Sequence, residues 1–153
     1  MRVIALTTAT PEVRPGERPR VDAIVVDPQG PRDVSVRWRL CRESRVGDPR
    51  ACAAAAAAID LGDGAGVRLP ALEAPDGAYF VFAAACVGGA PVFAASLTHF
   101  RCADGAPAEE VFRRIGVQAQ GPLNRPPGVA RWVLRQGGQV IEMPELPGAR
   151  VSL

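Results

Sequence analysis

The sequence predicts an all-β fold, namely an antiparallel β-sandwich with a short alanine-rich helix in one loop and a β-strand C-terminal extension. Two runs of alternating apolar residues, 21–26 and 34–40, follow the opening motif PEVRPG at residues 11–16 and flank a turn at 27–30. Such alternation is typical of strands buried on one face. A later turn, PDG, delivers the only tyrosine, Tyr79, to the start of another apolar run. Together these features favour two packed sheets.

The first half of the chain contains three predicted strands. A short strand covers Val3 to Leu6, and the proline-rich segment 11–19 leaves it along a sheet edge, where missing N–H groups are tolerated. The second strand covers Arg20 to Val26. In the third, Val34 to Leu40, every second residue is apolar, which places Trp38 at the centre of the core.

A short helix is predicted in the loop that follows the third strand. Asp48 suits a helix N-cap and Pro49 suits the first helical position. Residues 50–58 then contain seven alanines, which gives high helix propensity and little to bury. Because so short a helix is marginal in water, it needs a tether. The alternative is an alanine-rich insertion without stable structure.

Four further strands are predicted in the second half. The run 66–72 alternates, and the run from Tyr79 to Cys86 is apolar on both faces, which indicates a central strand with Tyr79 in the core. After a Gly88-Gly89 turn, residues 92–100 return as a strand, and 111–117 form the last one. Residues 3–118 are therefore expected to form one sandwich of about seven strands.

The C-terminal part is predicted to stand apart from this sandwich. We place the domain at residues 1–118, a Pro/Gly linker at 119–128, and a β extension or the start of a second, incomplete module at 129–153. The extension holds three short strand candidates, at 130–134, 139–143 and 149–153. A motif beginning at Pro144 echoes the opening motif. Because the extension has too little apolar material for its own core, we expect it to bind a protein partner or neighbouring subunit, with docking on the first domain as the next alternative.

Composition excludes several function classes. All basic residues are arginines, the net charge is +2, and no basic stripe runs along the chain, so nucleic-acid binding is not predicted. The most apolar region, 79–95, is broken by glycine and proline and falls short of the about 20 residues of a membrane span. The chain opens on Met1-Arg2-Val3-Ile4 without an apolar signal segment, which leaves a processed extracytoplasmic protein and a cytoplasmic one as alternatives.

The four cysteines indicate disulfides. Cys41, Cys52, Cys86 and Cys102 form an even set, and none of their spacings is the two-residue gap of a zinc knuckle. In a small β-rich chain, such a set favours disulfides and an oxidising compartment, which makes an extracytoplasmic location the first choice. A metal pair of His99 and Cys102 would need two further ligands from elsewhere.

No catalytic set is evident, and we expect no enzyme activity and no cofactor. Ser96 and His99 are three apart, which places them on opposite faces of a strand. Asp60 and Asp63 are weak candidates for a calcium site in a loop, although turns select aspartate for local hydrogen bonds anyway. Arg131 and Trp132 are candidates for a partner-binding platform, because arginine and tryptophan are frequent interface anchors.

The order of these pieces resembles the Ig-like or PKD-like modules of surface lipoproteins and secreted proteins of GC-rich, myxobacterial-type bacteria. The shared pieces are the opening motif, the pattern VxWxxC at 36–41, the pattern PxGxY at 75–79, and the segment LNRPP at 123–127. The resemblance covers about residues 3 to 128. It implies a spacer, stalk or adhesive unit of the cell envelope, with a module that binds a glycan, a peptide or Ca²⁺ as the alternative.

The disulfide pattern departs from the antibody one. The usual bridge joins strands B and F, but here the B-like strand has no cysteine. If the strands that carry Cys41 and Cys86 are the antiparallel strands C and F, these two cysteines lie at opposite ends of the sheet, too far apart to pair. We therefore expect the local pairs Cys41–Cys52 and Cys86–Cys102.

Overall fold

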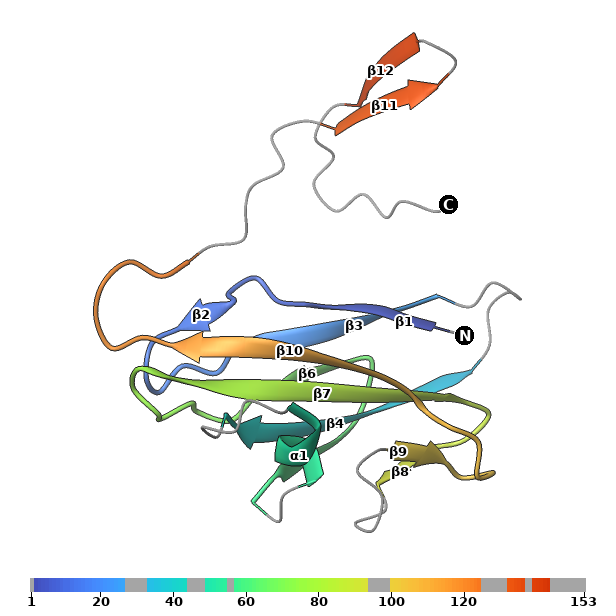
Figure 1. Ribbon diagram of the computed structural model, residues 1–153, viewed down its shortest axis with the longest axis horizontal. Helices are drawn as coiled ribbons and strands as arrows, with labels where there is room; N and C mark the ends of the chain where they lie inside the picture. Colours follow the sequence, from blue (N-terminus) through green and yellow to red (C-terminus); the bar gives the residue numbers. More distant parts are fainter. Residues whose placement is uncertain are drawn as a thin grey trace.

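A computed structural model describes residues 2–26, 33–43, 49–54, 57–93, 100–124, 132–136 and 139–143 (Figure 1). The fold is all-β. The described elements are β1 (Arg2–Thr7), β2 (Glu12–Val13), β3 (Arg20–Val26), β4 (Val34–Arg42), α1 (Pro49–Ala54), β5 (Ile59–Asp63), β6 (Gly66–Arg68), β7 (Gly77–Val87), β8 (Pro91–Phe93), β9 (Phe100–Cys102), β10 (Glu109–Val117), β11 (Trp132–Gln136) and β12 (Gln139–Met143).

Two sheets contain most of the strands. The smaller has the order β1-β3-β6 and the larger has the order β2-β10-β7-β4-β5. The sequence predicts purely antiparallel pairing. The structure differs at one place, because β2 runs parallel to β10. The reason lies in the proline-rich segment after β1, which leaves the smaller sheet and brings β2 beside the last strand of the larger one.

The core lies between these sheets. Trp38 of β4 is fully buried at its centre, as predicted, and its indole N–H donates a hydrogen bond of 2.7 Å to the carbonyl oxygen of Gly64. Tyr79, in contrast, is only partly buried. It packs against the core from its margin, where it pairs with Arg42 near the end of β4, so the expectation of a buried Tyr79 is met only in part. The buried core residues are Leu6, Val13, Val21, Val36, Trp38, Leu40, Leu69, Leu72, Val81, Ala83, Ala85, Ile115 and Val117.

Strand β7 is central and buried on both faces, as its apolar sequence predicts. It lies between β10 and β4. Val81 and its neighbours on one face belong to the main core. On the opposite face, Phe80 and Phe82 form a second cluster with Cys52 and Ala53 of α1. The ring of Phe112 on β10 completes this outer cluster and stays half exposed.

Two disulfide-linked elements cover the outer face of the larger sheet. Cys41 of β4 is bonded to Cys52 of α1, and Cys86 of β7 is bonded to Cys102 of β9. These are the pairs expected from the sequence. Cys41 lies opposite Phe80 in the register, whereas Cys86 lies opposite Ser35 at the other end of β4.

Arg39 on β4 lies between the two covering elements and contacts both. Its guanidinium donates to the carbonyl oxygen of Ala53 at 2.7 Å, and its Cζ lies 4.1 Å from the centre of the Phe93 ring. The first contact holds α1, and the second is a cation–π interaction with β8. Burial lowers the pKa of Arg39, with a smaller contribution from Arg37, but a guanidinium remains charged.

Several strand boundaries differ from the sequence expectations. Ile59–Asp63, predicted as loop, is β5 and pairs with β4. The strand predicted over 66–72 ends at Arg68, just before Leu69-Pro70, because proline cannot donate to a ladder. Pro91–Phe93 and Phe100–Cys102 pair with each other as β8 and β9, so a single strand over 92–100 is wrong. Residues 2–118 thus carry ten described strands instead of about seven.

The C-terminal extension contains a hairpin, β11–β12, with Trp132 opposite Met143. Both strands were expected from the sequence. The third candidate, at 149–153, lies outside the described residues. Among the described elements, no helix is long and apolar enough to cross a membrane.

Replacement of Trp38 by alanine should lower the free energy of unfolding by about 3 to 5 kcal/mol, because it leaves a large cavity and an unpaired carbonyl at Gly64. Trp38→Phe should cost less, since much of the ring volume remains. Chemical denaturation followed by circular dichroism measures both values. A loss below about 1 kcal/mol for Trp38→Ala would place the ring outside the core.

Removal of either disulfide should also destabilise the domain. The bridges close loops with sequence separations of 11 and 16, and loops of this size give about 3 kcal/mol each in the loop-entropy account. The paired variants Cys41→Ser with Cys52→Ser, and Cys86→Ser with Cys102→Ser, should each lower the denaturation midpoint. Peptide mapping without reductant checks the pairing, and a Cys41–Cys86 peptide would contradict the register of β4 and β7.

Candidate functional site

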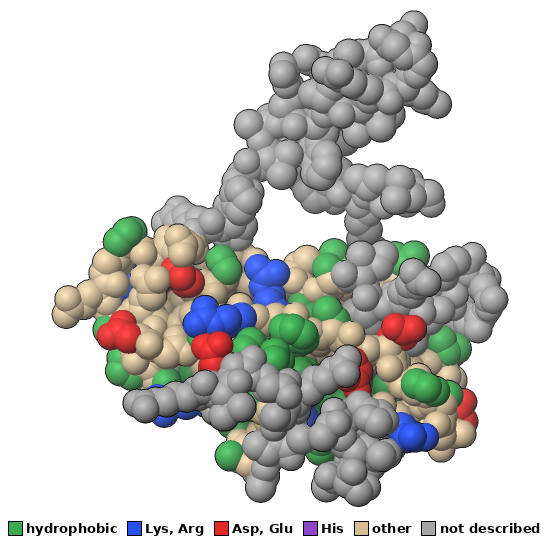
Figure 2. All heavy atoms as spheres, in the orientation of Figure 1, with side chains coloured by type: hydrophobic (Ala, Val, Ile, Leu, Met, Phe, Trp, Pro, Cys, Tyr) green, Lys and Arg blue, Asp and Glu red, His purple; other side chains and the backbone are tan. Residues whose placement is uncertain are grey.

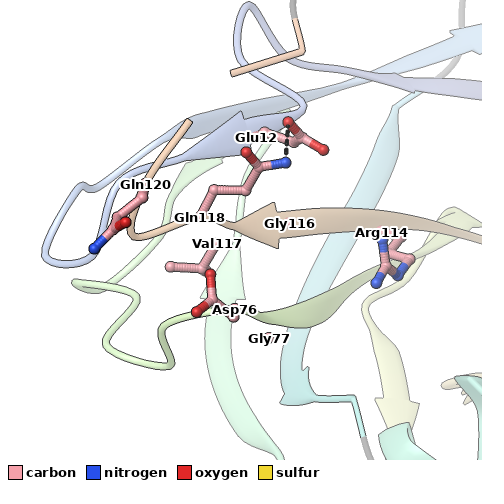
Figure 3. Close-up of a pocket in the computed structure, with 8 residues that line it drawn as sticks. All are labelled: Glu12, Asp76, Gly77, Arg114, Gly116, Val117, Gln118 and Gln120. Atoms are coloured by element: carbon pink, nitrogen blue, oxygen red, sulfur yellow. Dashed lines mark hydrogen bonds between the residues drawn. The ribbon is translucent and has the colours of Figure 1, made fainter. Parts of the chain in front are cut away.

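A polar hollow of about 310 Å³ lies on the larger sheet where β10 ends (Figure 3). Its lining includes Gly116, which has no side chain to fill the space. A Cβ atom on Gly116 would lie 3.2 Å from Cγ of Glu12, so glycine gives the Glu12 side chain its room. Its lining residues are Glu12, Asp76, Gly77, Arg114, Gly116, Val117, Gln118 and Gln120.

Glu12 of β2 is the most heavily bonded side chain at this site. Its carboxylate accepts hydrogen bonds from the side-chain amide of Gln118 at 2.8 Å, and from the backbone and side-chain N–H groups of Asn124 at 2.7 and 2.9 Å. Figure 3 shows Glu12 and Gln118 facing each other from β2 and the end of β10. The backbone N–H of Asn124 is the chief cause of a lowered Glu12 pKa, and Gln118 and Arg114 add to it.

Two more side chains hold the residues that follow β10. We call residues 118–124 the exit segment. The guanidinium of Arg14 donates to the carbonyl oxygens of Gln118 and Gly121, and the Asp76 carboxylate accepts from the backbone N–H of Ala119 at 3.3 Å. Asp76 has φ 55°, a left-handed conformation that aspartate tolerates better than most residues. The first residues of the predicted linker therefore lie against the domain.

A second hollow, of about 550 Å³, lies between the opening motif and the exit segment. It is lined by Ala9, Thr10, Glu12, Arg14, Pro122, Leu123 and Asn124. Because Glu12 lines both hollows, its carboxylate lies between them. The exit segment is consequently attached here by hydrogen bonds more than by close packing.

Arg114, the cation of the first hollow, is already paired. Its guanidinium contacts the Glu43 carboxylate at 2.9 Å, and this hydrogen bond is the main cause of a raised pKa for Arg114. On the face drawn in Figure 2, blue and red side chains are interspersed and neither forms a continuous stripe. This part of the surface therefore does not present a single-sign field.

The two calcium candidates are not in a loop. Asp60 and Asp63 lie on β5, and Asp60 is paired with Arg37 of β4 at 2.6 Å. The Arg37 hydrogen bond is the main cause of a lowered Asp60 pKa, and the backbone N–H of Gly62 adds to it. Within the described residues, no three His, Cys, Asp or Glu side chains form a metal-binding group.

The remaining sequence candidates lie elsewhere. The four cysteines and Trp38 stabilise the fold and do not line either hollow. Trp132 begins β11, whereas Arg131, Ser96 and His99 lie outside the described residues. The residues that the sequence did not single out are Gln118, Asn124 and the two side chains of the opening motif, Glu12 and Arg14. The sequence signal for Glu12 and Arg14 is that they are charged residues inside a proline-rich motif, and Gln118 and Asn124 have no such signal.

The exit segment should loosen as the pH falls. The pKa of Glu12 is below its ordinary value of 4.5 in the folded protein, so the bonds of its carboxylate are fully present above that value and are lost as the pH falls through the lower, folded pKa. The backbone amide signal of Asn124, followed by NMR against pH, should report this step. In Glu12→Gln the step should vanish, and its persistence would assign it to another group.

No family model, no curated protein and no solved structure matches the chain.

Proposed function

We propose that this chain is a non-catalytic, Ig-like structural module of an extracytoplasmic assembly, and that it engages a neighbouring subunit through its C-terminal extension. The observation that carries the proposal is the contrast between two parts of the molecule. Residues 2–124 have a complete core between two sheets, whereas β11 and β12 pair only with each other among the described strands. A lone two-stranded hairpin is marginal in water, so a partner is needed to stabilise it.

The strand order supports the Ig-like part of the proposal. If β1, β3, β4, β6, β7 and β10 are lettered A, B, C, E, F and G, the two sheets contain the orders A-B-E and G-F-C. These are the neighbours found in immunoglobulin-like sandwiches, and β5 takes the place of the extra strand beside C. The position of Trp38 on β4, fully buried, is also that of the core tryptophan of such domains.

The two disulfides support an extracytoplasmic location. Both attach an element with little core of its own to the larger sheet: α1 has six residues, and β8 and β9 have three each. Elements this small depend on their cross-links. In a reducing compartment these links would open, so the architecture suits an oxidising one.

The engagement of the charged groups supports a structural role. In the first hollow, Glu12 is bonded to Gln118 and Asn124, and Arg114 is bonded to Glu43. On β4 and β5, Arg37 and Asp60 are bonded to each other. Each of these groups holds one part of the domain to another, which suits a rigid spacer.

A ligand-binding module is the second candidate, favoured by the open hollow of about 310 Å³. Its lining includes the amides of Gln118 and Gln120 and the carboxylate of Asp76, which are suitable partners for the hydroxyl groups of a glycan. NMR titration of the chain with a set of glycans would discriminate the two. Saturable shifts around Gln120 would favour this candidate.

Deletion of residues 129–153 tests the leading proposal. The free energy of unfolding of the shortened chain should lie within about 0.5 kcal/mol of that of the full chain, because β11 and β12 share no sheet with the domain. The full chain should co-purify with a larger envelope assembly, and the shortened chain should not. Retained co-purification would assign the contact to the domain itself, and unfolding of the remainder would make the extension part of the first core.

A further inference from the structure

We propose that Glu12 and Arg14 form a latch that docks the exit segment, residues 118–124, onto the domain and so fixes the direction in which the chain leaves it. Proline and glycine in this region indicate a flexible linker when the sequence is considered alone. The structure instead ties its first part down at both ends. Glu12 and Arg14 lie more than 100 positions from the residues that they hold.

Five hydrogen bonds of the two latch residues, and one more from Asp76, hold the exit segment. Glu12 accepts three, Arg14 donates two, and Asp76 accepts one. All six involve an ionised side chain, and the three bonds of Glu12, at 2.7 to 2.9 Å, have the short lengths of charge-assisted hydrogen bonds, which are about twice as strong as neutral ones. Their partners are spread over the segment, from Gln118 to Asn124. A segment held at both ends and in its middle cannot reorient as a unit without breaking several bonds.

Polar bonding, more than burial, controls this docking. The exit segment spans the hollow of about 550 Å³ beneath Pro122, Leu123 and Asn124, and residues 119–122 are exposed. Little apolar area is therefore removed from water when the segment docks. Glu12 supplies half of these bonds, and among the described residues it is the only one bonded to Asn124, the last residue held. It is a positioning residue whose loss should free the far end of the segment.

The location of the latch gives it a consequence for assembly, and this step rests on the proposed function. The next described residues after Asn124 are those of the hairpin β11–β12. When the exit segment is docked, the domain sets the point from which the extension starts and the direction in which it begins. A neighbouring subunit bound through the extension would then be held at a defined side of the domain, beside β2.

The test uses the full chain labelled with ¹⁵N at neutral pH. In the wild type, the heteronuclear NOE of residues 118–124 should match that of β10. In Glu12→Ala, the exchange of the Asn124 amide with solvent should rise about tenfold, as expected for the loss of a hydrogen bond to a charged group. Amides of Ile115 and Val81 in the core should not change. Glu73→Gln is the matched control, because Glu73 is exposed and lines neither hollow.

Glu12→Gln keeps the side-chain volume and carries the test if the alanine variant does not fold. A neutral amide oxygen accepts more weakly, so the Asn124 exchange rate should still rise about threefold. Low NOE values across 119–124 in the wild type, or unchanged exchange in both variants, would overturn the latch. An equal rise in Glu73→Gln would also overturn it. No partner is present in these measurements, so the latch and the assembly role can fail independently.

Discussion

The constraint on which the structure depends is that β7 is apolar on both faces and both must be covered. One face, with Val81 and Ala83, is covered by the smaller sheet through the shared core. The other face, with Phe80 and Phe82, is covered among the described residues by α1 and by the short strands β8 and β9. Because these covering pieces are too small to be stable alone, each is fastened by a disulfide that starts from β4 or β7 itself.

Arginine performs much of the remaining fastening. Its fork of donors can bond a backbone carbonyl while the charge stays partly hydrated. Arg39 bonds Ala53, Arg14 bonds Gln118, and Arg113 donates to the carbonyl oxygen of Leu6 at 2.8 Å, which joins β10 to β1 across the two sheets. In each case a cation on one element holds the backbone of another. The charged residues thus contribute to the fold more than to a surface field.

The sequence was sufficient for features that depend on local periodicity. Alternation placed β3 and β4, two-sided apolarity placed β7, and the separation of Cys41 from Cys86 along antiparallel strands led to the disulfide pairs. It was insufficient where tertiary context decides. The sequence of Ile59–Asp63 does not predict an edge strand, because β5 is stabilised by pairing with β4 and by the bond between Arg37 and Asp60. Tyr79 has the alternation of a core residue but lies at the margin of the core.

The candidate site was the least predictable part, because it depends on contacts between distant segments. Glu12 and Arg14 read as ordinary charges in a proline-rich turn, and their partners lie beyond residue 117. Gly116 leaves room for the Glu12 side chain only because β2 and β10 pair in the register that sets Gly116 opposite Glu12. Composition describes what a segment can do alone, whereas docking of the exit segment is decided by what lies beside it.

The parallel pairing of β2 with β10 has a mechanical consequence. Backbone N–H groups of Gly116 and Gln118 donate to the carbonyl oxygens of Pro11 and Val13 at 3.1 and 3.0 Å. Because the two strands run in the same direction, tension between residues before β2 and residues after β10 pulls them in opposite directions along their length. The bonds between them then share the force at the same time and do not open one after another. The bonds of Glu12 and Arg14 lie in parallel with these, so this corner of the domain is built to resist stretching.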